Sequence, residues 1–149
     1  MTMETNDAGI NLIKEFEGLR LEAYKDIAGI WTIGHGHTRT AIEGMIIDLE
    51  RALELLKGDL KEAETYVTRA IAGSRTTPNQ FSAMVSLAYN IGNGNFGKST
   101  VLKEHKAGNH QSAARAFLLW DKATIDGQLT QVAGLARRRE SERQLYLTA

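Results

Sequence analysis

The sequence contains no cysteine, only one proline and few aromatic residues. Without cysteine there are no disulfides, thiolate metal ligands or thiol nucleophiles, so packing alone must hold the fold together. The formal net charge is 0 because 18 basic residues balance 18 acidic ones, which argues against a binder of polyanions along the whole chain. The longest apolar runs, Met45–Ile47 and Ala116–Trp120, are far shorter than the roughly 20 residues that span a bilayer.

The composition is that of one globular domain, with 149 residues, 42% of them hydrophobic and 24% charged. The balanced total hides an asymmetry between the two halves. Residues 1–74 carry 13 acids and 8 bases, whereas residues 75–149 carry 5 acids and 10 bases. The first half is therefore acidic and the second basic, and we expect the basic half to face an anionic partner.

Apolar spacing predicts an α+β fold that is mostly helical. A first helix is expected to begin after a cap at Asn6 or Asp7 and to end at Gly18. Residues 19–39 combine strand formers with glycines, which predicts a small antiparallel sheet. A long helix is expected to follow over about 48–71.

Helical signals continue through the second half of the chain. Gly58 lies inside the long predicted helix and either marks a bend or simply weakens it. Thr77 and Pro78 form a strong helix start, and the apolar residues after them predict a buried central helix that ends near Gly92. Three further helices are expected, over about 98–106, 110–122 and 134–147.

Two carboxylates near the N-terminus, Glu17 and Asp26, are candidates for catalysis. A helix C-terminus disfavours negative charge, which suits Glu17 to keeping a proton, whereas a turn keeps Asp26 solvated and ionised. Glycoside hydrolysis needs such a pair, one as acid and one to stabilise the transition state or activate water. Thr32 lies six positions after Asp26, where its hydroxyl can hold that water. Taken singly, the three residues also fit ordinary roles as a helix-end glutamate, a turn former and a strand residue.

Three separated motifs decide between these interpretations. They are Glu17–Asp26 with Trp31–Thr38, Thr77–Gly92, and Gly134–Glu142 with its Gly-Leu-x-x-Arg-Arg-x-x-Glu pattern. In this order they closely resemble the phage-type lysozymes, glycoside hydrolase family 24, which are endolysins of tailed phages. The resemblance covers about residues 8–147, and the Glu-x8-Asp-x5-Thr spacing is the family's catalytic pattern.

The resemblance implies a two-lobed, lysozyme-like α+β fold within a single domain over residues 1–149. A small lobe, about residues 15–60, would carry the N-terminal antiparallel sheet. A helical lobe, about residues 61–149 plus the N-terminal helix, would be joined to it by the long helix. The glycan chain would lie between the lobes.

The implied reaction is hydrolysis of the β-1,4 link between N-acetylmuramic acid and N-acetylglucosamine in peptidoglycan, without a cofactor or metal. Glu17 would be the general acid, and Asp26 with Thr32 would position the attacking water. The family is generally taken as inverting, which requires carboxyl groups about 6.5–9.5 Å apart. A lytic transglycosylase, or an inactive peptidoglycan-binding module, is the alternative; the presence of Asp26 and Thr32 disfavours both.

Four residues are predicted to bind substrate: Tyr24, His35, Gln80 and Arg138. Gln80 is equally a candidate cap for the central helix. His35 departs from the family pattern, which usually has an aliphatic residue or tyrosine there. The resemblance makes His37 a structural histidine paired with an acid, and this is favoured over a metal-binding pair with His35.

The arginines and glutamates of the last motif are expected to be mostly solvated, with one arginine pairing with Glu17 or a neighbour. Trp31 and Trp120 are expected to pack rather than to stack on sugars. The expected partner is the glycan strand of peptidoglycan, without nucleic acid or membrane insertion, and the protein is expected to be a monomer. The N-terminus shows no signal or anchor pattern, so we expect storage in the host cytoplasm, release by a holin and action on the periplasmic wall.

Overall fold

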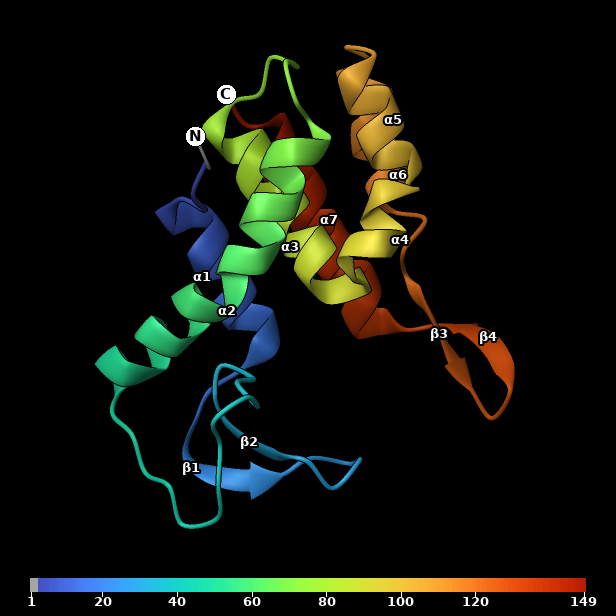
Figure 1. Ribbon diagram of the computed structural model, residues 1–149. Coiled ribbons are helices and arrows are strands. Elements are labelled where there is room, and N and C mark those ends of the chain that lie inside the picture. Colours follow the sequence, from blue (N-terminus) through green and yellow to red (C-terminus); the bar gives the residue numbers. More distant parts are fainter. Residues whose placement is uncertain (1–2) are drawn as a thin grey trace. The chain divides into compact units, whose positions relative to one another are not determined.

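The computed structural model describes residues 3–149, which form seven helices and four strands (Figure 1). The helices are α1 (Asp7–Glu17), α2 (Leu49–Ala70), α3 (Pro78–Ile91), α4 (Asn93–Gly97), α5 (Thr100–Lys106), α6 (His110–Phe117) and α7 (Ala133–Leu147). The strands are β1 (Arg20–Lys25), β2 (Trp31–Gly34), β3 (Lys122–Ile125) and β4 (Gln128–Gln131). The predicted α+β, mostly helical class is confirmed.

The chain divides into two compact units by its internal contacts. Residues 13–62 form one unit, which we call the sheet unit because it contains β1 and β2. The residues up to Leu12 and those from Ala63 to Ala149 form the other, which we call the helical unit. Among residues 3–149, no helix combines the length and apolar character that crossing a membrane requires.

Helix α1 begins and ends where its sequence signals predict. The Asn6 side chain caps the N-terminus by accepting a hydrogen bond from Gly9 N at 2.9 Å. At the other end Gly18 adopts a φ of 78° and its N–H donates to Lys14 O at 3.0 Å. Glycine enters this left-handed region without steric cost, so the chain turns directly after Glu17 and runs into β1.

The sheet unit is built on the antiparallel pair β1 and β2. Tyr24 faces Thr32 and Lys25 faces Trp31 across the ladder. The free edge of β1 is partly covered by the segment before α2, since Ala23 N donates to Met45 O and Ile47 N to Leu21 O, both at 2.9 Å. Helix α2 then runs without interruption through Gly58, so the predicted long helix is confirmed.

The helical unit is organised around α3. Thr77 and Gln80 form a reciprocal capping box around Pro78 at the start of the helix, in which each side chain accepts from the other's backbone N–H. Most of α3 is buried, including Phe81, and the helix packs against α7. Figure 1 shows α3 beside the dark red α7. The prediction of a buried central helix is therefore correct.

A second hairpin, β3–β4, lies between two predicted helices, in a stretch for which the sequence analysis predicts no element. Helix α6 ends at Phe117 rather than near residue 122, and the chain forms an antiparallel ribbon over 122–131 that projects from the helices of its unit (Figure 1). Asp126 and Gly127, with φ values of 51° and 79°, occupy the two-residue turn. An Asp-Gly pair between strand-forming residues is a strong hairpin signal, and the sequence analysis did not use it.

Candidate active site

Glu17 is the last residue of α1, and its half-buried carboxyl lies against the loop that follows β2. A Cβ atom on Gly36 would lie 3.3 Å from Glu17 Oε1. Gly36 also has a φ of 86°, a conformation that side chains rarely adopt. A glycine at position 36 therefore leaves room for the carboxyl oxygen as well as permitting the turn.

Asp26 follows β1 and opens the tight turn to β2. Its N–H donates to Ile30 O and its Oδ1 accepts from Ile30 N, both at 2.9 Å. Gly29 N donates to Asp26 O at 2.9 Å, with Gly29 in the left-handed region. The carboxylate is therefore held by its own turn while remaining half-exposed.

Thr32 is linked to the same turn through Ile30. The Thr32 hydroxyl, with its residue only 5% exposed, donates to Ile30 O at 3.0 Å. The backbone of Ile30 thus binds Asp26 through its N–H and Thr32 through its carbonyl. Because the Thr32 hydroxyl has one proton and gives it to that carbonyl, its oxygen can only accept a further hydrogen bond.

The Gly34–His37 turn is anchored on both sides. Ile33 and His37 exchange two backbone hydrogen bonds of 2.9 Å. The His37 Nδ1 lies 2.8 Å from Asp59 Oδ2 on α2, and Thr40 N donates to His37 Nε2 at 3.2 Å. The pairing of His37 with an acid, which the resemblance implies, is confirmed. The turn beneath the Glu17 carboxyl is thereby tied to α2.

Two of the predicted substrate-binding residues lie in this unit. His35 is 5% exposed, and its Nδ1 lies 2.6 Å from Gly18 O. Tyr24 is half-buried on β1, with the Arg20 guanidinium 4.3 Å from the centre of its ring. A cation over an aromatic face is attracted to it, which holds the Tyr24 ring in place.

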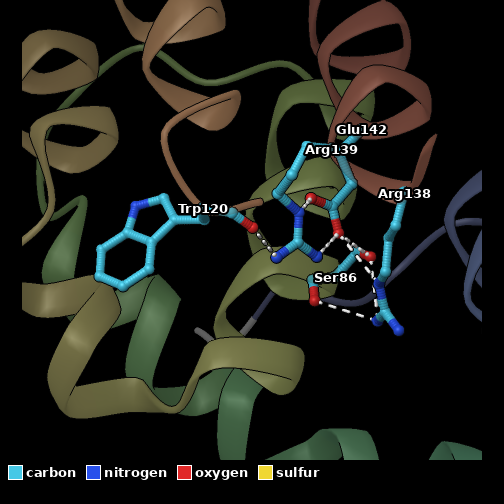
Figure 2. Close-up of polar contacts among 5 residues, drawn as sticks. All are labelled: Ser86, Trp120, Arg138, Arg139 and Glu142. Atoms are coloured by element: carbon cyan, nitrogen blue, oxygen red, sulfur yellow. Dashed lines mark hydrogen bonds and ion pairs between the residues drawn. The ribbon is translucent and has the colours of Figure 1, made fainter. Parts of the chain in front are cut away.

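The other two, Gln80 and Arg138, lie in the helical unit and already have structural partners. Gln80 closes the capping box of α3. Arg138 donates from Nε to Glu142 Oε2 at 3.3 Å and from Nη2 to Ser86 O at 3.2 Å (Figure 2). Their binding of substrate stays a prediction.

Figure 2 shows that Arg138 belongs to a buried cluster with Arg139, Glu142 and Ser86. Arg138, Arg139 and Glu142 are 3%, 0% and 0% exposed, so the expectation that this motif is mostly solvated is wrong for them. Ser86 Oγ donates to Glu142 Oε2 at 2.5 Å and Arg139 Nη2 to the same oxygen at 3.0 Å. Figure 2 also shows Arg139 Nη1 reaching the backbone oxygen of Trp120, at 3.3 Å.

Burial governs the electrostatics of this cluster. It raises the pKa of the Glu142 carboxyl and lowers the pKa of the Arg139 guanidinium, and each shift is partly offset by the partner's opposite charge. Arg139 Nε lies 2.7 Å from Glu142 Oε1 as an ion pair. The cluster fastens α7 to α3, since Ser86 belongs to α3.

The three predicted catalytic residues therefore lie in one unit, where Asp26 and Thr32 share the backbone of Ile30. The sequence did not predict that the backbone of Ile30 binds both Asp26 and Thr32, nor that Gly36 lies close to Glu17. It shows where the glycines are, but not which side chain lies against each of them. Among residues 3–149, no group of three histidine or acidic residues could hold a metal ion.

The family model named Phage lysozyme matches residues 14–142. The chain belongs to the phage lysozyme family. It is 38% identical to an endolysin of Acyrthosiphon pisum secondary endosymbiont phage 1, over 99% of this chain and 100% of that one. It is 41% identical to the endolysin of Salmonella phage P22, over 98% and 99% of the two chains.

Solved structures agree with this assignment. The muramidase domain of SpmX from Asticaccaulis excentricus superposes with a TM-score of 0.89 at 41% identity, over 98% of this chain and 99% of that one. The lysozyme-like fold is therefore confirmed. As a phage-type lysozyme the protein is a glycoside hydrolase, a muramidase of the endolysin kind that degrades peptidoglycan in host lysis.

Proposed function

We propose that this muramidase cleaves the glycan strand by a single displacement, with Glu17 as general acid and Asp26 with Thr32 holding the attacking water. The bond is the β-1,4 link from N-acetylmuramic acid to N-acetylglucosamine. The observation that carries the proposal is the shared backbone of Ile30, which ties Asp26 and Thr32 into one rigid turn.

The hydrogen bonds of this turn orient a water molecule. The Thr32 hydroxyl donates to Ile30 O, so its oxygen accepts one proton of the water. The Asp26 carboxylate has Oδ1 engaged with Ile30 N and accepts the second proton through Oδ2. With both protons directed at the protein, a lone pair of the water is left for the anomeric carbon. Asp26 then takes a proton as the new C–O bond forms.

Glu17 supplies the other proton. Its carboxyl gives a proton to the leaving glycosidic oxygen as the bond to the anomeric carbon breaks, so a reducing muramic end is released. The glycine at position 36, which lies against Glu17 Oε1, permits the carboxyl to sit on the Gly34–His37 turn. An inverting displacement of this kind needs about 6.5–9.5 Å between the two carboxyl groups, enough for one water.

Substrate contacts are proposed for Tyr24, Gln80 and Arg138. For His35, whose Nδ1 is engaged by Gly18 O, a substrate contact is the competing role, which a rise in KM on its substitution would indicate. Tyr24 is the best supported of the three, because it faces Thr32 across the β1–β2 ladder and keeps a partly exposed ring. An aromatic ring beside the water site can pack against a sugar face. Gln80 and Arg138 would have to bind the glycan in addition to the contacts that they already make.

The test is clearing of outer-membrane-permeabilised Gram-negative cells by the Glu17→Gln variant. We expect a loss of several orders of magnitude in clearing rate, with binding to the wall retained. Glu15→Gln is the matched control, because Glu15 is an exposed residue of the same helix and loses the same charge. Clearing by Glu17→Gln at the wild-type rate would overturn the mechanism.

Product analysis separates hydrolysis from the transglycosylase alternative. A lytic transglycosylase needs one acid–base group and no positioned water, and it leaves a 1,6-anhydro muramic end. Reducing muramic ends are expected from this protein. Anhydro ends would remove the role proposed for Asp26 and Thr32.

We also propose that the protein is a monomer that accumulates in the host cytoplasm and reaches the periplasmic wall when a holin permeabilises the membrane. Its expression in a Gram-negative host without a holin is expected to leave the cells intact until the membrane is permeabilised. Lysis without any such partner would contradict this route.

A further inference from the structure

His35 has a position that its predicted role does not explain. It is 5% exposed, and its ring points at the backbone beside Glu17, where Nδ1 lies 2.6 Å from Gly18 O. A carbonyl oxygen can only accept, so Nδ1 carries the proton in this bond. The neutral ring is therefore the Nδ1–H tautomer.

The residue that His35 binds is the most flexible one next to the general acid. Gly18 follows Glu17 directly and adopts a left-handed φ of 78°. Glycine has a wider range of backbone conformations than any other residue. Its N–H is held by Lys14 O at 3.0 Å, and its carbonyl by His35. The peptide groups on both sides of the Gly18 Cα are therefore fixed, and with them the end of α1.

The turn that carries His35 is itself anchored. His35 lies between Gly34 and Gly36 in the turn closed by Ile33 and His37, and His37 is tied to Asp59 on α2. The next residue, Gly36, is the one at which a Cβ atom would lie 3.3 Å from Glu17 Oε1. A single turn thus lies close to the acid at two points, its carboxyl oxygen and the backbone that follows it.

We propose that His35 is a positioning residue for Glu17, which restrains the Gly18 hinge so that the acid points at the leaving oxygen. This rests on the proposed role of Glu17. The ring itself need not touch the substrate. Proton transfer depends steeply on the placement of the acid, and a small displacement lowers the rate without changing how the glycan binds.

The test compares His35→Leu with His35→Asn on purified, dye-labelled peptidoglycan. Leucine fills a similar volume without a donor, whereas asparagine offers an N–H donor at the place of Nδ1. We expect kcat to fall about tenfold in His35→Leu, the order of one lost buried hydrogen bond, and to return within about threefold of wild type in His35→Asn. KM should stay within about twofold in both.

Three results would overturn the proposal. One is an equal kcat in the two variants, and another is a loss that falls on KM, which would make His35 a substrate-binding residue instead. The third comes from the wild-type protein and does not depend on any variant folding: ring nitrogen NMR should report the Nδ1–H tautomer, and an Nε2–H tautomer would exclude the bond to Gly18. Full activity of Glu17→Gln would refute the proposed acid while leaving that NMR result unchanged, so the two failures are distinguishable.

Discussion

The two units of the molecule use carboxylates in opposite ways. In the sheet unit Glu17 and Asp26 are half-exposed; the Glu17 carboxyl lies close to Gly36, and the Asp26 carboxyl accepts a hydrogen bond from Ile30 N. In the helical unit Glu142 is fully buried between two arginines and a serine. An acid that must exchange protons has to stay accessible, whereas an acid that joins helices can be sealed from water. Exposure therefore separates the two proposed catalytic carboxylates from the structural carboxylate of Glu142.

The charge balance differs between the units as well. The sheet unit contains ten acids and seven bases, and the helical unit eight acids and eleven bases, so their formal charges are −3 and +3. The asymmetry that the two halves of the sequence show is therefore retained when the chain is divided by its contacts.

Removing the charge of Asp26 should abolish activity without harming the fold. In Asp26→Asn the side-chain oxygen can still accept from Ile30 N, but no base remains to take the proton of the water. We expect kcat to fall by about 10²–10⁴, with the melting temperature unchanged. The matched control is Asp48→Asn, since Asp48 Oδ1 likewise accepts from a backbone N–H, that of Arg51 at 2.8 Å. Equal activity losses in the two variants would contradict the assignment.

Glu142→Gln should have the reverse effect. It leaves the Arg138 and Arg139 guanidiniums buried without their anion, and breaking a buried ion pair in this way costs about 3–5 kcal/mol of unfolding free energy. Glu140→Gln breaks only the surface pair with Arg143, which is worth about 0–1 kcal/mol. Urea unfolding measures the loss in both variants. A similar midpoint for the two would show that burial does not determine how much each carboxylate contributes to the free energy of unfolding.

Acid should weaken the helical unit through His105. This ring is 1% exposed, with Tyr146 Oη 2.6 Å from Nδ1 and Thr76 Oγ1 2.8 Å from Nε2. Burial, with a smaller contribution from His110, lowers its pKa from 6.5 to about 4. The unfolded chain therefore binds a proton at a higher pH than the folded one does. Stability present above pH 6.5 is lost as the pH falls towards 4, by as much as about 3 kcal/mol.

The measurement for His105 is the unfolding free energy between pH 7 and pH 4 in wild type and His105→Gln. A neutral glutamine does not titrate in this range, so the variant should show a shallower decline whatever its absolute stability. Exposed His residues would not produce this difference. Identical pH slopes in the two proteins would show that His105 is not responsible.

Gly58→Ala should stabilise the sheet unit slightly. Gly58 is an exposed residue inside α2, and a Cβ there would meet nothing within 4 Å. Replacing glycine by alanine in a helix interior gains about 0.5–1 kcal/mol. Thermal unfolding should show a small increase in melting temperature with unchanged clearing activity. A decrease in melting temperature would contradict this prediction, and reduced clearing at an unchanged melting temperature would indicate that Gly58 contacts the wall.

Local signals predicted most of the elements, and long-range contacts were the part that sequence could not supply. Gly18 and the Thr77-Pro78 pair marked helix ends because their conformational preferences act within one turn. The spacing of Glu17, Asp26 and Thr32 predicted the catalytic candidates through the family resemblance. The burial of Glu142 was not predictable in this way, because its partner Ser86 lies 56 residues away in the chain.

The missed hairpin has a different cause. The apolar run that ends at Trp120 favours a helix to about residue 122, and the Asp126-Gly127 turn signal beyond it, with strand formers on each side, was not used. A helical period and a short apolar run are hard to distinguish near an element boundary. A different limit applies to His35, which is predicted to bind substrate: its hydrogen-bond partner Gly18 lies 17 residues away in the chain, and only the fold brings the two together.

The division of roles between Glu17 and Glu142 is tested most directly by the clearing rate per folded molecule of Glu17→Gln and Glu142→Gln, measured side by side at low temperature with melting temperatures on the same samples. We expect Glu17→Gln to melt like wild type and to clear several orders of magnitude more slowly. We expect Glu142→Gln to melt at a much lower temperature and, where folded, to clear at close to the wild-type rate. Rapid clearing by Glu17→Gln, or an inactive but fully stable Glu142→Gln, would contradict this division of roles.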